Sequence, residues 1–151
     1  MADILHRVGI KASSETVYQA LTTREGLAGW WTTDTQGDAD AGGVIKFRFS
    51  ADGREIGGFD TKVVELRPAA RVLWQVLDGP AEWIGTKISF DLKQDGEYAI
   101  VLFKHVDWKE SAEFMHHCST KWATFLISLK ELIETGKGAP SPRDMQISNW
   151  H

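Results

Sequence analysis

One amphipathic segment near the C-terminal end constrains the fold more than any other part of the chain. Between Trp108 and Gly138, apolar side chains recur at steps of three and four, the spacing that lines one face of an α-helix. They are Phe114, Cys118, Trp122, Phe125, Leu126, Leu129, Leu132 and Ile133. Gly136 follows the last of them as a stop signal. The pattern predicts a helix of about 25 residues, roughly 37 Å long, whose apolar face needs a broad partner surface.

The middle of the chain supplies that surface as a series of strands. Apolar and polar side chains alternate there with a period of two, and turn pairs such as Asp52-Gly53 separate the alternating runs. Two short helices follow the first strand, one capped by Ser13 or Ser14 and one around Trp30 and Trp31. The polar stretch 34–43 is a loop that can hold a short edge strand. Strands are predicted over residues 3–12, 44–50, 59–66, 72–77, 86–93 and 98–106.

This order of elements predicts an α+β domain. An antiparallel meander with one polar face has to cover its other face, and the C-terminal helix is the element long and apolar enough to do so. We therefore expect a curved antiparallel sheet of six to seven strands wrapped around one long C-terminal helix, with two short helices after the first strand. Residues 1–138 form this single domain, and residues 139–151 form an extended tail. Ile147 and Trp150 in the tail suggest docking onto the domain itself or onto a second copy in a homodimer.

Composition and charge exclude several classes of protein. The net charge is −4 and the 17 basic residues are scattered, which argues against nucleic acid as a partner. No apolar run approaches the roughly 20 residues of a membrane-spanning helix, and the N-terminus lacks the layout of a signal peptide. Cys118 is the one cysteine, so an internal disulfide is impossible. These features predict a cytoplasmic protein that associates with no membrane.

The aromatic content departs most from an average composition. Seven tryptophans in one domain indicate either a bulky core or a cavity lined by rings. Rings around a curved sheet pack imperfectly, and such a cavity would suit an apolar or aromatic small molecule. The candidates are Trp30, Trp31, Phe47, Phe49, Phe59, Trp74, Phe90, Phe103, Phe114, Trp122 and Phe125.

Three polar residues are candidates to orient a ligand inside such a cavity. His105 ends a predicted strand on the face that carries Phe103, where a neutral imidazole could bind a ligand or act as a general base. Alternatively, a backbone carbonyl or a carboxylate satisfies this histidine. Glu65 faces the interior if Val63 does, and it faces solvent in the opposite register. Tyr18, on the first short helix, is the third candidate.

The sequence predicts no metal, cofactor or nucleophile site. His116, His117 and Cys118 are adjacent, but neighbouring helical residues point about 100° apart and cannot hold one ion together. Cys118 lies on the apolar stripe, where a cysteine behaves as a small buried hydrophobe. No glycine-rich phosphate loop follows a strand, and the pairs at 42–43 and 57–58 predict turns or bulges.

Three stretches together resemble a known family. Residues 14–22 with Trp30-Trp31 resemble a "V-[WY]-x-A-L-T … W-W" pattern, and residues 101–105 match the end of a last strand that finishes in histidine. Residues 122–138 resemble the end of that pattern's long helix. One difference is that Ser119-Thr120-Lys121 precedes Trp122, whereas the pattern commonly has a glycine next to this tryptophan. The family is that of domains homologous to the activator of the ninety-kilodalton heat-shock protein's ATPase. It lies within the START-like, helix-grip superfamily, also called SRPBCC.

The resemblance implies the helix-grip fold and several alternative functions, because a shared fold does not settle function. The first is a non-catalytic binding module for a hydrophobic small molecule. The second is a chaperone ATPase-regulating interaction domain with a role in stress response. The third is a polyketide cyclase-like enzyme with His105 as the base. The predicted ligand-binding residues are Tyr18, Trp30, Trp31, Phe47, Phe49, Phe59, Glu65, Trp74, Phe90, Phe103, His105, Phe114, Cys118, Trp122 and Phe125.

Overall fold

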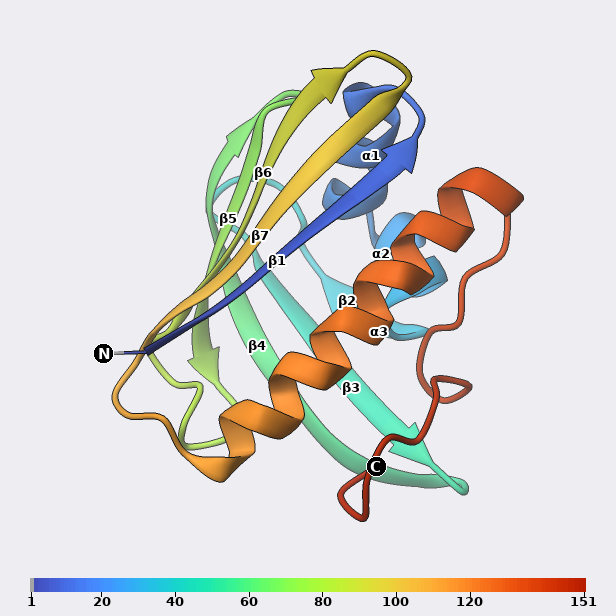
Figure 1. The fold of residues 1–151 in the computed structure, drawn as a ribbon. Helices are drawn as coiled ribbons and strands as arrows, with labels where there is room; N and C mark the ends of the chain where they lie inside the picture. Colours follow the sequence, from blue (N-terminus) through green and yellow to red (C-terminus); the bar gives the residue numbers. More distant parts are fainter. Residues whose placement is uncertain (1) are drawn as a thin grey trace.

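A seven-stranded antiparallel sheet forms the framework of residues 2–151, which are the residues described by this computed structural model. The strands lie in the order β1-β7-β6-β5-β4-β3-β2 (Figure 1). From β2 to β7, sequential strands are neighbours, as turn-linked strands should be, whereas β1 lies beside β7 at the edge opposite β2. Their bounds are β1 Ala2–Lys11, β2 Asp34–Gly37, β3 Val44–Ala51, β4 Arg54–Arg67, β5 Arg71–Asp78, β6 Lys87–Asp95 and β7 Tyr98–Trp108.

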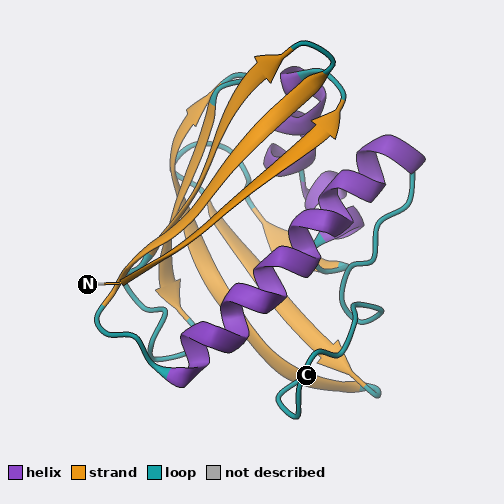
Figure 2. Cartoon of the chain, viewed as in Figure 1, coloured by secondary structure: helices purple, strands orange, loops and turns teal. Residues whose placement is uncertain are grey.

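The long helix lies across the concave face of this sheet (Figure 2). It is α3, Glu113–Thr135, and it ends at Gly136, whose φ of 89° is the left-handed conformation that glycine adopts without strain. The short helices α1 (Ser14–Thr22) and α2 (Arg24–Trp30) follow β1 and pack near the C-terminal half of α3. The predicted α+β architecture, a curved antiparallel sheet around one long helix, is confirmed.

Strand β4 is longer than the sequence predicted. It begins at Arg54 rather than near Phe59, and it pairs with β3 through a shift in register between Phe49 and Ser50. Opposite this shift, Ile56 is the extra residue on β4, next to Gly57. The glycine pair 57–58 therefore marks a bulge within a continuous strand, where the missing side chains let the strand bend.

Stacked tryptophans fill the space between the sheet and the helices. Trp30 and Trp31, at the end of α2, lie with ring centroids 5.5 Å apart and planes 6° apart. Trp31 in turn stacks on Trp74 of β5, at 5.7 Å and 5°. All three side chains are buried. The indole N–H of Trp30 donates to the carbonyl of Ala20 at 3.0 Å, so its polar atom is satisfied inside the core.

The segment 139–151 turns back from the end of α3 and runs along it towards the β3–β4 hairpin (Figure 1). Its start is held by backbone hydrogen bonds: the Ser141 N–H donates to the Trp31 carbonyl at 2.8 Å, and the Ser141 carbonyl accepts from Thr33 at 3.0 Å. Gly138 passes so close to α2 that a Cβ atom there would lie 2.5 Å from the carbonyl oxygen of Gly29. The tail is therefore attached closely at its beginning.

Ser128 joins the tail to the end of α2 from within α3. Its buried hydroxyl donates to the Trp30 carbonyl at 2.8 Å and accepts from the Ala139 N–H at 2.7 Å. Ser128→Ala removes a partner from both backbone groups, and we expect the free energy of unfolding to fall by about 2 kcal/mol. Urea denaturation measures this loss. The control is Ser111→Ala at an exposed position, which should change stability by no more than about 0.5 kcal/mol. Equal effects of the two variants would show that the Ser128 hydroxyl does not hold the tail.

Candidate functional site: an aromatic cavity under helix α3

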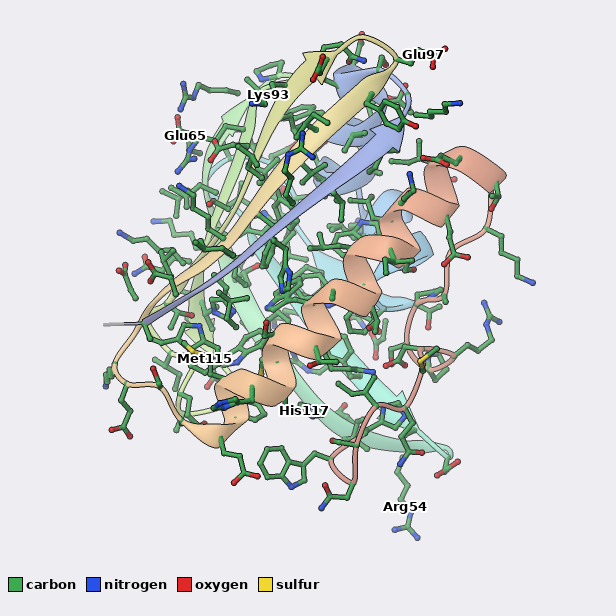
Figure 3. The ribbon with its side chains drawn as sticks, viewed as in Figure 1. Arg54, Glu65, Lys93, Glu97, Met115 and His117 are labelled. Carbon is green, nitrogen blue, oxygen red and sulfur yellow. The ribbon has the colours of Figure 1, made fainter. Side chains whose placement is uncertain are left out.

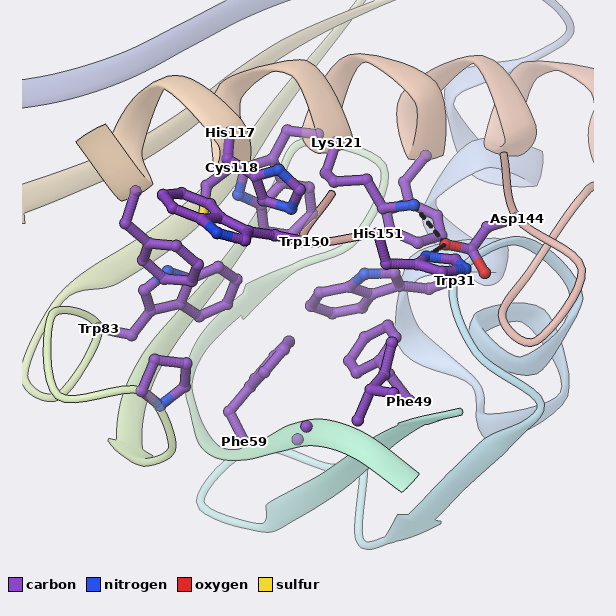
Figure 4. A pocket seen from close by; sticks show the side chains of 17 residues that line it. Trp31, Phe49, Phe59, Trp83, His117, Cys118, Lys121, Asp144, Trp150 and His151 are labelled. Carbon is purple, nitrogen blue, oxygen red and sulfur yellow. Dashed lines mark hydrogen bonds and ion pairs between the residues drawn. The ribbon is translucent and has the colours of Figure 1, made fainter. Parts of the chain in front are cut away.

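A cavity of about 190 Å³ lies between α3, the β3–β4 hairpin, the β5–β6 loop and the C-terminal tail (Figure 4). Its walls are mostly apolar. The lining residues are Trp31, Phe49, Ile56, Gly57, Gly58, Phe59, Pro80, Trp83, Phe114, His117, Cys118, Lys121, Trp122, Phe125, Asp144, Trp150 and His151.

Flat aromatic faces form the inner walls. Trp31 contacts Phe59 with ring centroids 5.0 Å apart and Trp122 with centroids 4.9 Å apart. Trp83, from the β5–β6 loop, lies 4.6 Å from Phe59 and is stacked on Trp122 at 6.1 Å and 12°. These four rings come from a helix end, a strand, a loop and α3, so the fold itself brings them together. Their surfaces suit a flat apolar molecule.

The charged groups of the cavity lie on the side of the tail. Lys121 of α3 forms an ion pair with Asp144, and the two side chains are only 15% and 5% exposed. The Lys121 ammonium also donates to the Met145 carbonyl at 2.8 Å. The Nδ1 atom of His151 lies 3.6 Å from the same Asp144 oxygen. Because both charges of the ion pair are largely shielded from solvent, their mutual neutralisation matters more than at an exposed site.

His117 and Trp150 complete the outer wall. Nδ1 of His117 hydrogen-bonds to the Ser148 hydroxyl at 2.9 Å, and the Trp150 ring lies edge-on to the imidazole at 5.5 Å. Burial lowers the pKa of His117, and the positive charges of Lys121 and His151 lower it further. The imidazole is therefore neutral at pH 7, and this part of the wall adds no charge to the cavity.

His105 is buried, as the strand pattern predicted, but it lies behind the cavity wall. Its Nδ1 accepts from the Trp122 indole N–H at 3.1 Å, and its Nε2 lies 2.8 Å from the Thr86 hydroxyl. The Thr86 hydroxyl donates to the Trp83 carbonyl at 2.6 Å, so Nε2 carries the hydrogen and donates to Thr86. Burial lowers the pKa of His105 to about 3. Both ring nitrogens are therefore engaged, as expected for the alternative of a satisfied core histidine, although the partners are side chains rather than a backbone carbonyl or a carboxylate.

Glu65 lies on the outer face of the sheet, away from α3 (Figure 3). It forms ion pairs with Arg67 at 2.7 Å and with Arg71 at 3.2 Å. The pairing of β4 with β5 shifts in register between Val63 and Glu65, which breaks the alternation that would have turned both residues inward. The prediction of an interior carboxylate at Glu65 is therefore wrong.

The other predicted site residues divide into two groups. Those that line the cavity are Trp31, Phe49, Phe59, Phe114, Cys118, Trp122 and Phe125. Those placed in the packed core away from it are Trp30, Phe47, Trp74, Phe90 and Phe103. Tyr18 is half-buried on α1 against the core, also outside the lining. The sequence analysis missed Trp83, which lies in an irregular loop. It also missed the Lys121–Asp144 ion pair, because one residue lies in α3 and the other in the tail, and no periodic pattern connects the two.

The cavity holds a thiol that is not activated. Cys118 is 4% exposed, and burial raises its pKa to about 12, so the thiol stays protonated.

Within residues 2–151, no group of three His, Cys, Asp or Glu side chains is placed to hold a metal ion. In the same range, no helix has the length and the apolar character needed to cross a bilayer.

Comparison with solved structures identifies relatives of this fold. The "Aha1 dimer" from Colwellia psychrerythraea superimposes with a TM-score of 0.81 at 51% sequence identity, covering 91% of this chain and all of that one. CalU16 from Micromonospora echinospora gives a TM-score of 0.74 at 17% identity, covering 97% of this chain and 75% of that protein. DynU16, a putative protein of the dynemicin biosynthetic locus, gives 0.75 at 20% identity, covering 90% of this chain and 48% of that one. The last two similarities concern the fold alone.

The sequence itself matches a family model over most of its length. No curated protein matches the chain. The family model, described as "Activator of Hsp90 ATPase homolog 1-like protein", matches residues 11–134. This range runs from the end of β1 to the last turn of α3 and includes all of the sheet except most of β1. With its START-like helix-grip fold, the chain therefore belongs to the Activator of Hsp90 ATPase homolog 1-like family.

Proposed function

We propose that this protein is a non-catalytic binding module whose cavity takes an apolar aromatic small molecule. The observation that carries the proposal is a preformed space of about 190 Å³ walled by Trp31, Phe59, Trp83 and Trp122. Drug-sized sites measure roughly 300–1,000 Å³. The smaller volume therefore favours a ligand of one or two fused rings.

The state of the titratable groups supports binding over catalysis. His105, the base in the enzyme hypothesis, has both ring nitrogens in hydrogen bonds to other side chains. The Cys118 thiol in the cavity wall is protonated at neutral pH. Neither group is poised to take a proton from a ligand or to attack it.

Filling the cavity tests the proposal. Cys118 lines the cavity, so the ring in Cys118→Phe would take up ligand space. We expect the wild-type protein to bind 2-naphthamide, a neutral two-ring probe, in isothermal titration calorimetry, and the variant to bind it at least tenfold more weakly. Cys118→Leu, which adds less volume to the buried site, should weaken binding by an intermediate amount.

Circular dichroism and thermal melting of the same samples establish that both variants are folded. If the wild-type protein bound no aromatic probe, the proposed function would be wrong. If folded Cys118→Phe bound 2-naphthamide as tightly as the wild type, the probe would occupy another place and the cavity would not be the site.

Membership of the family supports a second candidate, regulation of a chaperone ATPase through the outer surface. A relative at 51% identity is described as an Aha1 dimer, so we also propose that this chain forms a homodimer. Light scattering coupled to size exclusion should then give twice the chain mass of 16.9 kDa. Stimulation of a ninety-kilodalton chaperone's ATPase that is the same for wild type and Cys118→Phe would favour the surface over the cavity.

A further inference from the structure

The ammonium group of Lys121 links the aromatic cavity to the tail. Its side chain lines the cavity, and its Nζ atom lies 5.2 Å from the centroid of the Phe125 ring. Its hydrogen bonds within residues 2–151 go to two tail acceptors, the Asp144 carboxylate and the Met145 carbonyl. If the tail moved away, a largely buried cation at the edge of an aromatic cavity would lose both partners.

The Asp144 carboxylate, which pairs with Lys121, has only one of its two oxygens hydrogen-bonded among the described residues. Oδ2 of Asp144 accepts from Lys121, whereas Oδ1 is buried without a hydrogen-bond partner among the described residues. A buried carboxylate oxygen without a donor is unfavourable, because in water it would be hydrogen-bonded. Across the boundary between the tail and α3, Asp144 is therefore held by the Lys121 charge, while its other neighbour, His151 at 3.6 Å, belongs to the tail itself. Another carboxylate can replace Asp144 beside Lys121.

Few hydrogen bonds and ring contacts attach the distal tail to α3. Beyond Asp144 and Met145, those of the described residues are the hydrogen bond of Ser148 to His117 and the ring contacts of Trp150 with His117 and Phe114. Trp150 remains 47% exposed. The backbone hydrogen bonds of Ser141 to Trp31 and Thr33 secure the start of the tail separately. The part from Asp144 onward can therefore leave the cavity while the start stays attached.

We infer that the cavity selects aromatic carboxylates, and that Asp144 is a built-in stand-in for the carboxylate of the ligand. The ring system lies among Trp31, Phe59 and Trp122, and its carboxylate pairs with Lys121 after Asp144 has swung out to solvent. In both states one carboxylate neutralises the lysine, so the exchange leaves no buried charge unpaired. A neutral aromatic ligand carries no carboxylate that could replace Asp144, so it leaves the Lys121–Asp144 ion pair intact.

This inference rests on the proposed function, and a matched pair of ligands tests the two separately. The carboxylate 2-naphthoate and the neutral amide 2-naphthamide have nearly the same shape, so their affinities differ through charge. In calorimetry at pH 7, Asp144→Asn removes the internal competitor. It should raise the ratio of the 2-naphthoate affinity to the 2-naphthamide affinity about tenfold over that of the wild-type protein.

A second variant, Lys121→Met/Asp144→Asn, removes both charges while keeping the length of the lysine stem, so no carboxylate is left buried alone. Its ratio of 2-naphthoate affinity to 2-naphthamide affinity should be at least tenfold below that of Asp144→Asn. If Asp144→Asn had the same ratio as the wild type, the proposed exchange of carboxylates would be wrong, while binding of both ligands would still support the apolar cavity. If neither ligand bound the wild-type protein, the proposed function and this inference would both be wrong.

Discussion

Replacing Trp31 by alanine is expected to lower the free energy of unfolding by about 3–5 kcal/mol, the range for a large aromatic side chain removed from a core. Trp31 is 1% exposed, stacks on Trp30 and Trp74, and forms the inner wall of the cavity. Its loss would merge the cavity with a new void that the surrounding rings cannot close. Chemical denaturation, with the slope of the transition checked against wild type, measures the loss.

The matched control for this experiment is Trp150→Ala. It removes the same side chain from a position that is 47% exposed, so its cost should be below about 1 kcal/mol. A Trp31→Ala protein as stable as Trp150→Ala would mean that the stacked rings contribute little, and that the core depends on the sheet and α3 without them.

The stability of the protein should fall as the pH drops below 6.5, with His105 as a main contributor. The folded-state pKa of His105 is about 3, because burial opposes the charged imidazolium, whereas in the unfolded chain it is about 6.5. Between these two pKa values, His105 is protonated in the unfolded state and neutral in the folded state. Each pH unit in this window therefore costs about 1.4 kcal/mol, and the whole window about 5 kcal/mol. The contribution is fully present above pH 6.5 and is lost as the pH falls towards 3.

Denaturation curves at pH 7.5 and pH 5 measure the first part of this loss, about 2 kcal/mol from His105. His105→Gln serves as the reference, since an amide can accept from Trp122 and donate to Thr86 but does not titrate in this range. The variant should be less stable at pH 7.5 and should lose less stability on acidification. Parallel pH dependence of the two proteins would show that His105 does not control the acid sensitivity, and would point to His117, whose pKa is also lowered.

The parts of the fold governed by a regular period could be predicted from the sequence. The apolar stripe of α3 placed Phe114, Cys118, Trp122 and Phe125 on its buried face, and all four line the cavity. Side chains that recur with the helical period of 3.6 or the strand period of 2 lie on the same face of the element, so the sequence pattern predicts which residues face the core. Alternation along β7 likewise placed His105 inside.

The polar details of the site depend on irregular chain, which has no such period. A single register shift turned Glu65 outward, although its neighbours fit either face. Thr86, the hydroxyl partner of His105, ends the loop that also brings Trp83 into the cavity. The partner of Lys121 lies 23 residues along the chain in the tail, a distance that no spacing rule relates to α3.

The close passage of the chain at Gly138 makes the route of the tail depend on a single position. A side chain at that position would collide with the Gly29 carbonyl, 2.5 Å from its first carbon, and with the Ser128 carbonyl, 2.9 Å away. A larger residue at position 138 would force the following segment of this chain onto another route, and the cavity would lose the wall that Asp144 provides. One position outside the site thus decides whether the cavity is covered by a charged segment or opens directly to solvent.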